Sequence, residues 1–486
     1  MRQSRPVSLA FPLLIALALA VAPARPAEKI PVTSSSQKAL SSFLDGRRLF
    51  DNLRLTDAIP YFEKAIREDG KFALAHLFLA QSAGTAKTFF DEMRKAEETS
   101  GGASRAEQLM IKGFDAGANA RPGVQLEMYQ DLVKEYPEDE RAQMLVGTAY
   151  MAQQEFPQAV EHLKKAIAIA PDFAPAYNQL GYALRSLERY DESEATFKKY
   201  TELLPTDPNP FDSYAELLLK MGRFDESIAQ YGKALEVNPH FANSFTGIAA
   251  CLMYQNKHDE ALAETKKEMA AARNPGETRL ALFTRAVVHM DRGDAEGALK
   301  EIGGELAIAE KLKDAGSMSA DRAAMANILL EEGKTDEALA QFKQSNDIIQ
   351  RSSLGADVKA ANALFHHANV ARVMIRKGDL ASARTETEAL RQEAEKRQSK
   401  NQMRLAHELN GLIALEQKDY AGAIAELKQA NQQDPRVLYN IALASQASGK
   451  TDDARSYAKW AAQFNGLPFL NYAYVRVKAE KLLAAL

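Results

Sequence analysis

The sequence is poor in cysteine, with Cys251 alone among 486 residues. A single cysteine excludes an intramolecular disulfide and any metal site built from several thiolates. Cys251 falls in the apolar stretch Ile248–Leu252, so we expect a small buried residue there. A reactive thiol would need exposure and an electropositive neighbourhood, which this stretch does not supply.

An excess of charge of one sign is also missing. The chain has 61 Lys and Arg against 65 Asp and Glu, a net charge of −4. Nucleic-acid binding would call for clustered basic residues, so we expect no nucleic-acid partner. The apolar share of 46% and charged share of 26% are typical of a folded protein, and the chain is too long for one compact core.

The one long apolar run, Val7 to Ala22, has 16 residues and contains Pro12, against about 20 residues needed to span a bilayer. Arg2 and Arg5 precede it, and the small residues of Ala22-Pro23-Ala24 follow it. This order predicts a Sec-type signal peptide over residues 1–24, export to the periplasm or beyond, and no membrane span after cleavage. The alternative is an uncleaved anchor.

No pattern of catalytic or metal-binding residues emerges from the sequence. His407-Glu408 is not followed by a second histidine one turn later, and His366 and His367 are adjacent, which on a helix points their rings about 100° apart. There is no glycine-rich phosphate loop between a strand and a helix. We therefore predict that the protein is not an enzyme and needs no cofactor or metal.

What the sequence does have is a register of small and apolar residues that returns every 34 positions. The three successive sets are Gly147, Tyr150, Ala159, Leu163, Ala166 and Pro171; Gly181, Leu184, Ser193, Phe197, Tyr200 and Pro205; and Ala215, Leu218, Ser227, Tyr231, Ala234 and Pro239. A fixed period of this length predicts an array of helix pairs that bury their apolar faces against one another. The glycines predict close approach of the partner helix, and each proline ends a pair.

The register also divides the chain. Residues 25–40 have no helical period and predict a flexible tether, 41–275 predict pairs of about 34 residues, and 276–465 predict longer pairs. Residues 466–486 predict a C-terminal capping helix. In the longer pairs, turn residues before an alanine recur at Gly293, Gly333, Gly378, Lys418 and Gly449. Leu380 to Arg404 is an almost unbroken helical run whose charges form a solvated face or, alternatively, a docking site.

The order of Gly, aromatic, Ala, Phe or Leu, Ala and Pro at this period resembles the tetratricopeptide repeat family. Gln143 departs from it, since the family's early aromatic stands at Tyr177 and Phe211 in the next two units. The resemblance implies an all-α, right-handed superhelical solenoid of antiparallel helix pairs. It also implies a concave groove, lined by the first helix of each pair, that binds protein or peptide partners.

Carrying the family's spacing over to this chain gives a set of nine predicted partner-binding residues. They are Asn178, Tyr182, Arg185, Asp212, Glu216, Lys220, Asn243, Met253 and Tyr254. Their mixture of aromatic, amide and charged side chains is typical of a peptide-binding face. The alternative is that they are solvated helix positions without a ligand.

The sequence therefore predicts a non-enzymatic interaction scaffold or adaptor of the periplasm or cell envelope. One alternative is a self-associating structural subunit, or an assembly or export helper, that docks through an apolar C-terminal helix. The side chains concerned are Phe469, Leu470, Tyr472, Tyr474, Leu482, Leu483 and Leu486. A second alternative is an enzyme with an unrecognised site, which would require a deep polar pocket with perturbed titrating groups.

Overall fold

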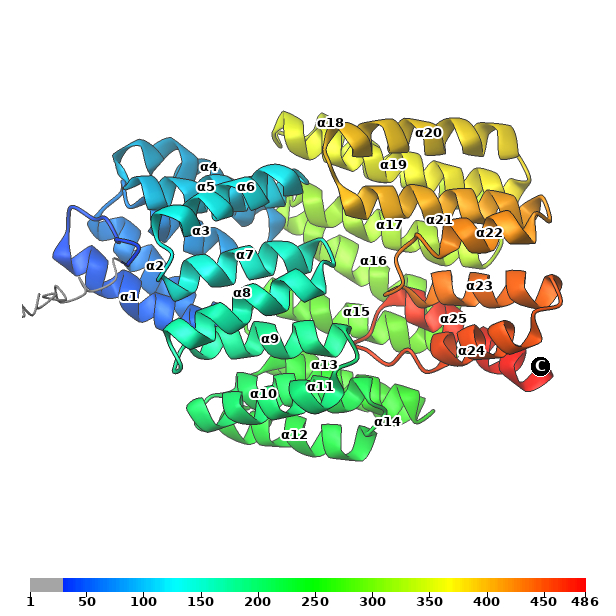
Figure 1. The fold of residues 1–486 in the computed structure, drawn as a ribbon, viewed down its shortest axis with the longest axis horizontal. Coiled ribbons are helices and arrows are strands. Elements are labelled where there is room, and N and C mark those ends of the chain that lie inside the picture. The colour runs from blue at the N-terminus through cyan, green and yellow to red at the C-terminus, as the bar shows by residue number, and fades with distance from the viewer. Residues whose placement is uncertain (1–28) are drawn as a thin grey trace, which may run out of the picture.

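The computed structural model describes residues 29–486, which form 25 α-helices and one 3-10 turn, η1 (Figure 1). The predicted signal peptide lies outside the described residues. The helices are α1 (Gln37–Asp51), α2 (Leu55–Glu68), α3 (Ala73–Gln81), α4 (Ala86–Thr99), α5 (Arg105–Ala118), α6 (Pro122–Glu135), α7 (Glu140–Ala152), α8 (Phe156–Ile169), α9 (Ala174–Ser186), α10 (Tyr190–Leu203), α11 (Pro208–Lys220), α12 (Phe224–Val237), α13 (Ala242–Tyr254), α14 (His258–Ala271), α15 (Pro275–Asp291), α16 (Ala295–Leu312), α17 (Ala315–Glu331), α18 (Thr335–Arg351), α19 (Ala356–Lys377), α20 (Leu380–Lys396), α21 (Lys400–Glu416), α22 (Tyr420–Leu427), α23 (Pro435–Ala447), α24 (Thr451–Ala462) and α25 (Leu470–Ala485), with η1 at Ser100–Gly102.

The first 24 helices form twelve consecutive pairs, each packed most closely within itself and then against the next pair. Odd-numbered helices also contact the odd-numbered helices of neighbouring pairs, as α9 does with α7 and α11. The odd helices therefore form an inner layer and the even helices an outer one. The predicted all-α solenoid of helix pairs is confirmed.

Small residues let the two helices of a pair approach closely. A Cβ atom on Gly181 would lie 2.5 Å from Cζ of Phe197, and one on Gly147 would lie 2.8 Å from Cγ of Leu163. Both neighbours are fully buried and belong to the second helix of the same pair. The contact explains why glycine, which costs about 1 kcal/mol in a helix relative to alanine, stands inside α7 and α9.

Longer helices form the part of the array from α15 to α21, but α22, α23 and α24, which also fall within the predicted longer pairs, have only 8, 13 and 12 residues. Helices α15 to α21 have 17 to 22 residues, against 13 or 14 in α7 to α14. All five predicted turn residues have positive φ, from +60° at Lys418 to +85° at Gly293. The predicted run from Leu380 to Arg404 is wrong, because Gln398 takes a φ of +52° and Ser399 caps a new helix, α21.

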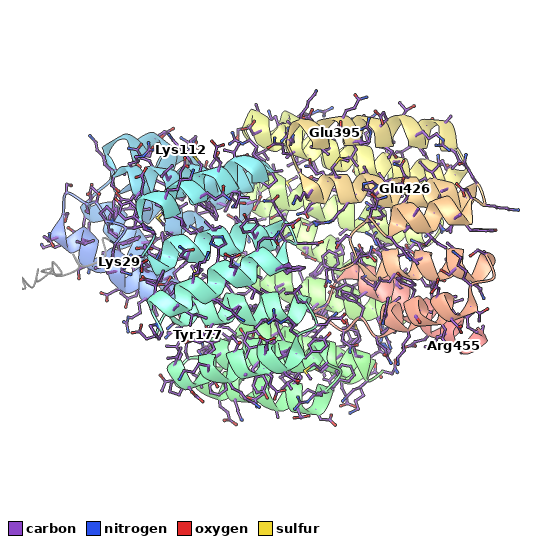
Figure 2. The ribbon with its side chains drawn as sticks, viewed as in Figure 1. Lys29, Lys112, Tyr177, Glu395, Glu426 and Arg455 are labelled. Carbon is purple, nitrogen blue, oxygen red and sulfur yellow. The ribbon has the colours of Figure 1, made fainter. Side chains whose placement is uncertain are left out.

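The segment 29–36 differs from the predicted flexible tether, because it is bound along the first three helix pairs and the start of the fourth. The ammonium group of Lys29 donates to the Glu138 carbonyl at 2.7 Å, and the amide of Thr33 donates to the Glu107 carboxylate at 2.8 Å. Ser36 then caps α1. Figure 2 shows Lys29 at the end of the molecule where the first helices lie.

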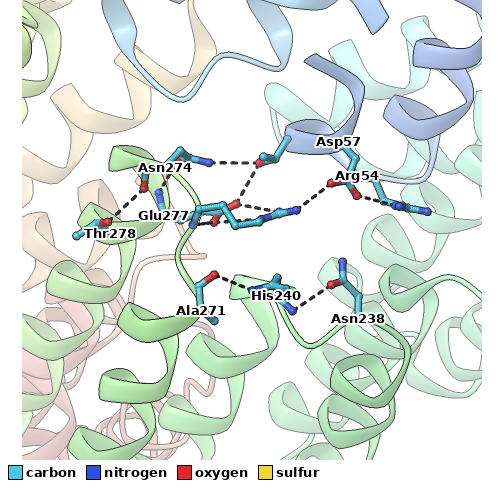
Figure 3. Close-up of polar contacts among 10 residues, drawn as sticks. Arg54, Asp57, Asn238, His240, Ala271, Asn274, Glu277 and Thr278 are labelled. Atoms are coloured by element: carbon cyan, nitrogen blue, oxygen red, sulfur yellow. Dashed lines mark hydrogen bonds and ion pairs between the residues drawn. The ribbon is translucent and has the colours of Figure 1, made fainter. Parts of the chain in front are cut away.

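The array curls far enough for its beginning to touch its eighth pair (Figure 3). The Thr56 hydroxyl in α2 donates to the Glu277 carboxylate in α15 at 3.0 Å and accepts from the Asn274 amide at 3.4 Å. The guanidinium of Arg273 donates to Asp57 at 2.8 Å. These contacts join segments more than 200 residues apart in sequence, so they fix the pitch of the superhelix.

The same offset recurs further along the chain. The amide of Ala86 in α4 donates to Asp314 beside α17, and the Asn401 side chain in α21 donates to the carbonyl of Ala152 at the end of α7. In each case the two segments belong to pairs that are seven apart in the chain. One superhelical turn therefore takes seven helix pairs, and the second turn lies directly against the first (Figure 1).

The last helix, α25, does more than cap the array. It packs on α23 and α24, and also on α15 in the inner layer of the superhelix. Figure 1 shows it in red, turned back beside α15. The C-terminal segment thus lies inside the solenoid and reaches the helices that carry most of the predicted site.

Candidate functional site

Five of the nine predicted residues meet on α9 and α11, in what we call the α9–α13 groove, defined by Tyr182, Arg185, Asp212, Glu216, Lys220 and Tyr254. Arg185 pairs with Glu216 at 3.2 Å, and its guanidinium lies over the Tyr182 ring, 4.6 Å from the centroid. Asp212 accepts a hydrogen bond from the Ser244 hydroxyl of α13 at 2.7 Å. These five predicted residues therefore lie in one polar cluster on the inner layer.

Burial shifts the titration of this cluster. Desolvation, followed by repulsion from Glu216, raises the pKa of Asp212 well above its usual range. Desolvation and the nearby charge of Arg185 lower the pKa of Lys220 to about 8. Shifted pKa values of this kind occur at functional sites and also in buried structural networks. The residues packed against the cluster distinguish the two.

Those neighbours belong to the chain itself. The ammonium group of Lys220 lies 3.5 Å from the centroid of the Phe464 ring. The hydroxyl of Tyr254 donates to the Gly466 carbonyl at 2.9 Å, and the Gly466 amide approaches the same hydroxyl at 3.3 Å. Residues 464–469 therefore lie along the α9–α13 groove, with a cation–π contact at Phe464 and a main-chain contact at Gly466.

A buried ion pair fixes the segment that follows. Arg476 in α25 donates through Nε and Nη2 to the carboxylate of Asp291 in α15, at 2.8 and 2.5 Å, and also to the Asn256 side chain at 2.9 Å. His258 approaches Asp291 at 2.8 Å. The Asp291 side chain is fully buried, so the ion pair joins α25 to the inner layer out of contact with solvent.

Two of the predicted residues do not belong to the groove. Met253 is fully buried in the core, so its predicted place on the concave surface is wrong. It precedes Tyr254, and adjacent helical residues point about 100° apart, so only one of them can face the groove. Asn243 shares the face of Tyr254 but lies eleven residues away, about 16 Å along α13, where it lines a cavity beside Leu53 and Arg273.

Asn178 and Asp212 lie beneath the surface of the groove. Each is 2% exposed, and Asn178 accepts a hydrogen bond from Ser213 at 3.4 Å. Of the apolar side chains proposed for self-association, Leu470 and Tyr474 are buried and Phe469 is 50% exposed. The other four, Tyr472, Leu482, Leu483 and Leu486, are partly exposed.

A second concave site, which the sequence did not predict, lies on the inner layer of the second turn. This C-terminal cavity has a volume of about 390 Å³ and is lined by side chains from α17, α19, α21, α23 and α25. Its walls include Leu330, Ile375, Leu412 and Val475. Its size and its mixture of aliphatic walls with a few polar groups are typical of ligand-binding pockets.

The polar groups of this cavity form a chain of shared charges. Arg372 donates to Glu408 at 3.1 Å, and Arg436 pairs with Asp434 at 3.0 Å and with Glu408 at 3.9 Å. Burial alone would lower the pKa of Arg436, but attraction to Asp434 and Glu408 outweighs it and raises the pKa. Burial, followed by repulsion from Glu331, raises the pKa of Tyr474, whose hydroxyl therefore stays protonated.

The other candidate reactive groups contact neighbouring side chains. Within residues 29–486 no group of three or more His, Cys, Asp or Glu side chains is placed to hold a metal ion. Cys251 is buried, which raises its pKa to about 12, and its thiol contacts the Ser227 hydroxyl at 3.3 Å. His367 pairs with Glu386 on the neighbouring helix. No helix in the described part of the chain is long and apolar enough to cross a bilayer.

Comparison with known families places tetratricopeptide repeats in the middle of the array. Residues 147–187 match a TPR repeat profile, and residues 174–207 and 215–268 match tetratricopeptide repeat profiles. These segments coincide with α7 to α14. No curated protein matches the chain significantly. Tetratricopeptide repeats are protein-interaction modules, and proteins built from them are typically non-enzymatic scaffolds.

Among solved structures, the chain is similar to TTC0263, a thermophilic TPR protein of Thermus thermophilus, with 25% identity over 44% of this chain and 99% of that one and a TM-score of 0.30. It is similar to MamA, with 20% identity over 34% of this chain and 91% of that one and a TM-score of 0.29. It is also similar to YrrB, a TPR protein with an unusual peptide-binding site, with 20% identity over 37% and 91% and a TM-score of 0.26.

Proposed function

We propose that this chain, which contains tetratricopeptide repeats, is a non-enzymatic scaffold that binds a partner protein in its C-terminal cavity. The observation that carries the proposal is the contrast between the two concave sites. In the α9–α13 groove, Lys220 and Tyr254 bind the chain's own residues 464–466. The C-terminal cavity offers aliphatic walls and polar groups on the same inner layer, and no other segment of the described chain is bound along it.

The predicted residues of the α9–α13 groove then have a role within the chain. Arg185, Glu216 and Lys220 line the surface along which the segment before α25 lies. Substituting them would loosen the superhelix as well as any binding surface. Variants in this groove are for that reason poor tests of partner binding.

Residues 1–24 support the further proposal that the scaffold acts in the cell envelope, because Arg2, Arg5 and the apolar run have the order of a Sec signal. The test is a fusion of residues 1–40 to a reporter phosphatase that is active only after export. We expect activity, and cleavage after Ala24 by N-terminal sequencing. An inactive fusion retained in the cytoplasm would contradict the proposal.

The binding proposal is tested by capture of proteins from an envelope extract on residues 25–486, compared between variants. Arg376 and Tyr439 lie at the C-terminal cavity and are incompletely buried, so Arg376→Glu with Tyr439→Ala changes its mouth without opening the core. Arg455→Glu, on the exposed side of α24, is the matched control.

We expect a protein that binds the wild type and the control but is lost from the double variant. Equal capture by all three would place the binding surface elsewhere and contradict the proposal. Light scattering of the same proteins tests the self-association alternative, for which Phe469 and Trp460 are exposed apolar side chains near the C-terminal helix. A dimer that Phe469→Ser and Trp460→Ser dissociate would favour that alternative.

A further inference from the structure

The two turns of the superhelix meet along a seam, where each of the first four helix pairs contacts the pair seven further along the chain. We call these four pairs and the segment before them, residues 29–169, the N-terminal arm. The contacts run from α2 against α15 at one end to α7 against α21 at the other. They are hydrogen bonds and ion pairs, as Figure 3 shows for α2 and α15.

Buried apolar side chains do not join the arm to the second turn. The apolar clusters of the described residues lie either within residues 30–221 or within residues 215–479, and none combines the arm with pairs 8 to 12. Ala86 approaches Gly316 across the seam, but this contact buries a single methyl group. Burial of apolar surface is the main favourable term in most packed interfaces, so the seam lacks the contribution that holds consecutive pairs together.

Two cavities interrupt the seam. One of them, about 500 Å³, lies between α2 and the start of α15 and has Ile59 and Leu280 in its walls. The other, about 560 Å³, lies between α4 and the loop before α19 and has Phe90 and Leu354 in its walls. In both, apolar side chains of the two turns face a common space without filling it. Protein interiors leave few voids larger than a water molecule, so the turns are less closely packed than an interior.

The ion pairs of the seam are open to solvent. Arg273 and Asp57 keep 31% and 26% of their side-chain surface exposed, and Lys400 and Glu155 keep 58% and 21%. Arg404 lies 3.7 Å from the same Glu155 carboxylate. Exposed ion pairs contribute little, and salt screens them, because the Debye length falls from about 10 Å at 0.1 M to about 3 Å at 1 M ionic strength. The ionic contacts across the seam are therefore weak and sensitive to salt.

The C-terminal end of the superhelix is held differently. One apolar cluster joins α13 and α15 to α25, with Tyr254, Val287 and Val475 among its buried members. The buried ion pair of Arg476 with Asp291 also joins α25 to α15. Pairs 7 and 8 are thus tied to the C-terminal helix by buried side chains, whereas exposed polar contacts tie the arm to the second turn.

We propose that the N-terminal arm lifts away from the second turn as a unit and closes again, with its helix pairs intact and the C-terminal end of the superhelix fixed. The seam is then a clasp that opens as the ionic strength rises. Its opening widens the gap between the turns into a lateral entrance to the inner layer. The pairs of the arm share buried apolar clusters, so they move together, and small rotations between the pairs that follow supply the motion. Lifting of the arm does not depend on the proposed function.

The test measures distances between spin labels on residues 25–486 by pulsed electron paramagnetic resonance. One label pair crosses the seam, at Lys64→Cys in α2 and Lys300→Cys in α16, and a control pair lies within the arm, at Lys64→Cys and Lys112→Cys in α5; all three lysines are exposed. The native Cys251 is buried, so it stays unlabelled. We expect one distance across the seam in about 0.05 M salt, and a second, longer one that replaces part of it in about 1 M salt. The distance within the arm should stay unchanged.

A charge variant tests the seam at constant salt. Lys400→Glu with Arg404→Glu places two acids opposite Glu155, so the fraction of molecules with the longer distance should rise about twofold or more in about 0.05 M salt. The matched control, Lys233→Glu with Lys266→Glu, changes the net charge equally at exposed positions on α12 and α14, in pairs that have no counterpart seven pairs away. We expect this control to behave like the wild type. Circular dichroism checks that each variant keeps the helix content of the wild type.

Three results would overturn the inference. The first is a single distance across the seam that neither salt nor the seam variant changes. The second is lengthening of the distance within the arm along with the distance across the seam, because the pairs would then be unravelling and not lifting together. The third is an equal response of the two charge variants, which would assign the opening to net charge and not to the ion pairs of the seam.

Discussion

Replacing Arg476 with methionine should loosen the C-terminal end of the superhelix. Arg476 and Asp291 are buried, with side-chain exposures of 6% and 0%. Methionine keeps most of the aliphatic volume but leaves Asp291 without its cation. Breaking one partner of a buried ion pair costs about 3–5 kcal/mol. His258 still contacts Asp291 in the variant, so we expect the lower end, about 3 kcal/mol.

The assay is urea unfolding followed by the fluorescence of Trp460, the only tryptophan of the sequence. Trp460 lies on α24, against which α25 packs, so its signal reports this end of the array. A local probe is needed because a long repeat array need not unfold in one step. The free energy of unfolding obtained from this signal should fall by about 3 kcal/mol.

The matched control is Lys478→Met, two residues further along the same helix. Its ion pair with Glu331 is exposed, with 52% of the lysine side chain accessible, and an exposed pair contributes about 0–1 kcal/mol. If both variants lower the unfolding free energy equally, the buried pair does not hold α25 in place and the reasoning fails.

Three further outcomes follow from individual side chains. Gly181→Ala should lower the melting temperature, because the added Cβ atom would lie 2.5 Å from the buried Phe197 ring. Gly232→Ala, whose Cβ atom would have no neighbour within 4 Å, should raise the melting temperature slightly through its higher helix propensity. Scanning calorimetry measures both. Burial raises the pKa of Glu268 to about 8. Above about pH 4.5 the unfolded chain releases a proton that the folded state keeps, so the free energy of unfolding should fall as the pH rises from about 4.5 to 8. Glu268→Gln should flatten this fall by up to about 4 kcal/mol in urea titrations at pH 5 and 8, and an unchanged slope would contradict the assignment. Asp69→Asn should loosen the chain at Ser34 and Ser35, whose hydroxyls bind that carboxylate, and limited proteolysis should then cleave there faster than in Asp172→Asn.

The helix pairs could be predicted from the sequence because their signals are local. Gly181 and Phe197 stand 16 residues apart and meet within one pair, and the turn residues Gly293 and Gly378 adopt the positive φ that their type favours. A 34-residue period follows directly from such contacts. The break at Gln398 was missed because glutamine carries no signal for a left-handed conformation.

The contacts between superhelical turns could not be predicted in this way. Asp57 and Arg273 meet across 216 residues, and their pairing depends on the curvature accumulated over seven helix pairs. A small error in the angle between neighbouring pairs would separate them. The contacts of Phe464 with Lys220 and of Gly466 with Tyr254 depend on the same curvature, so they too could not be predicted from the sequence.

The C-terminal cavity was missed for a related reason. Arg372, Arg436 and Tyr474 lie on helices of unequal length, where the spacing between equivalent positions changes from pair to pair. The 34-residue spacing of the earlier repeats therefore does not predict which face these three residues occupy. The place of Tyr474 in the cavity wall also depends on the return of α25 onto α23.

The most direct test of the account is hydrogen–deuterium exchange of residues 25–486 with and without the captured partner, resolved by mass spectrometry. We expect slower exchange in α19, α21, α23 and α25, and unchanged exchange in α9, α11 and residues 464–469. The contradicting result is protection of α9 and α11 with faster exchange in 464–469, which would mean that the partner displaces the chain's own segment from the α9–α13 groove.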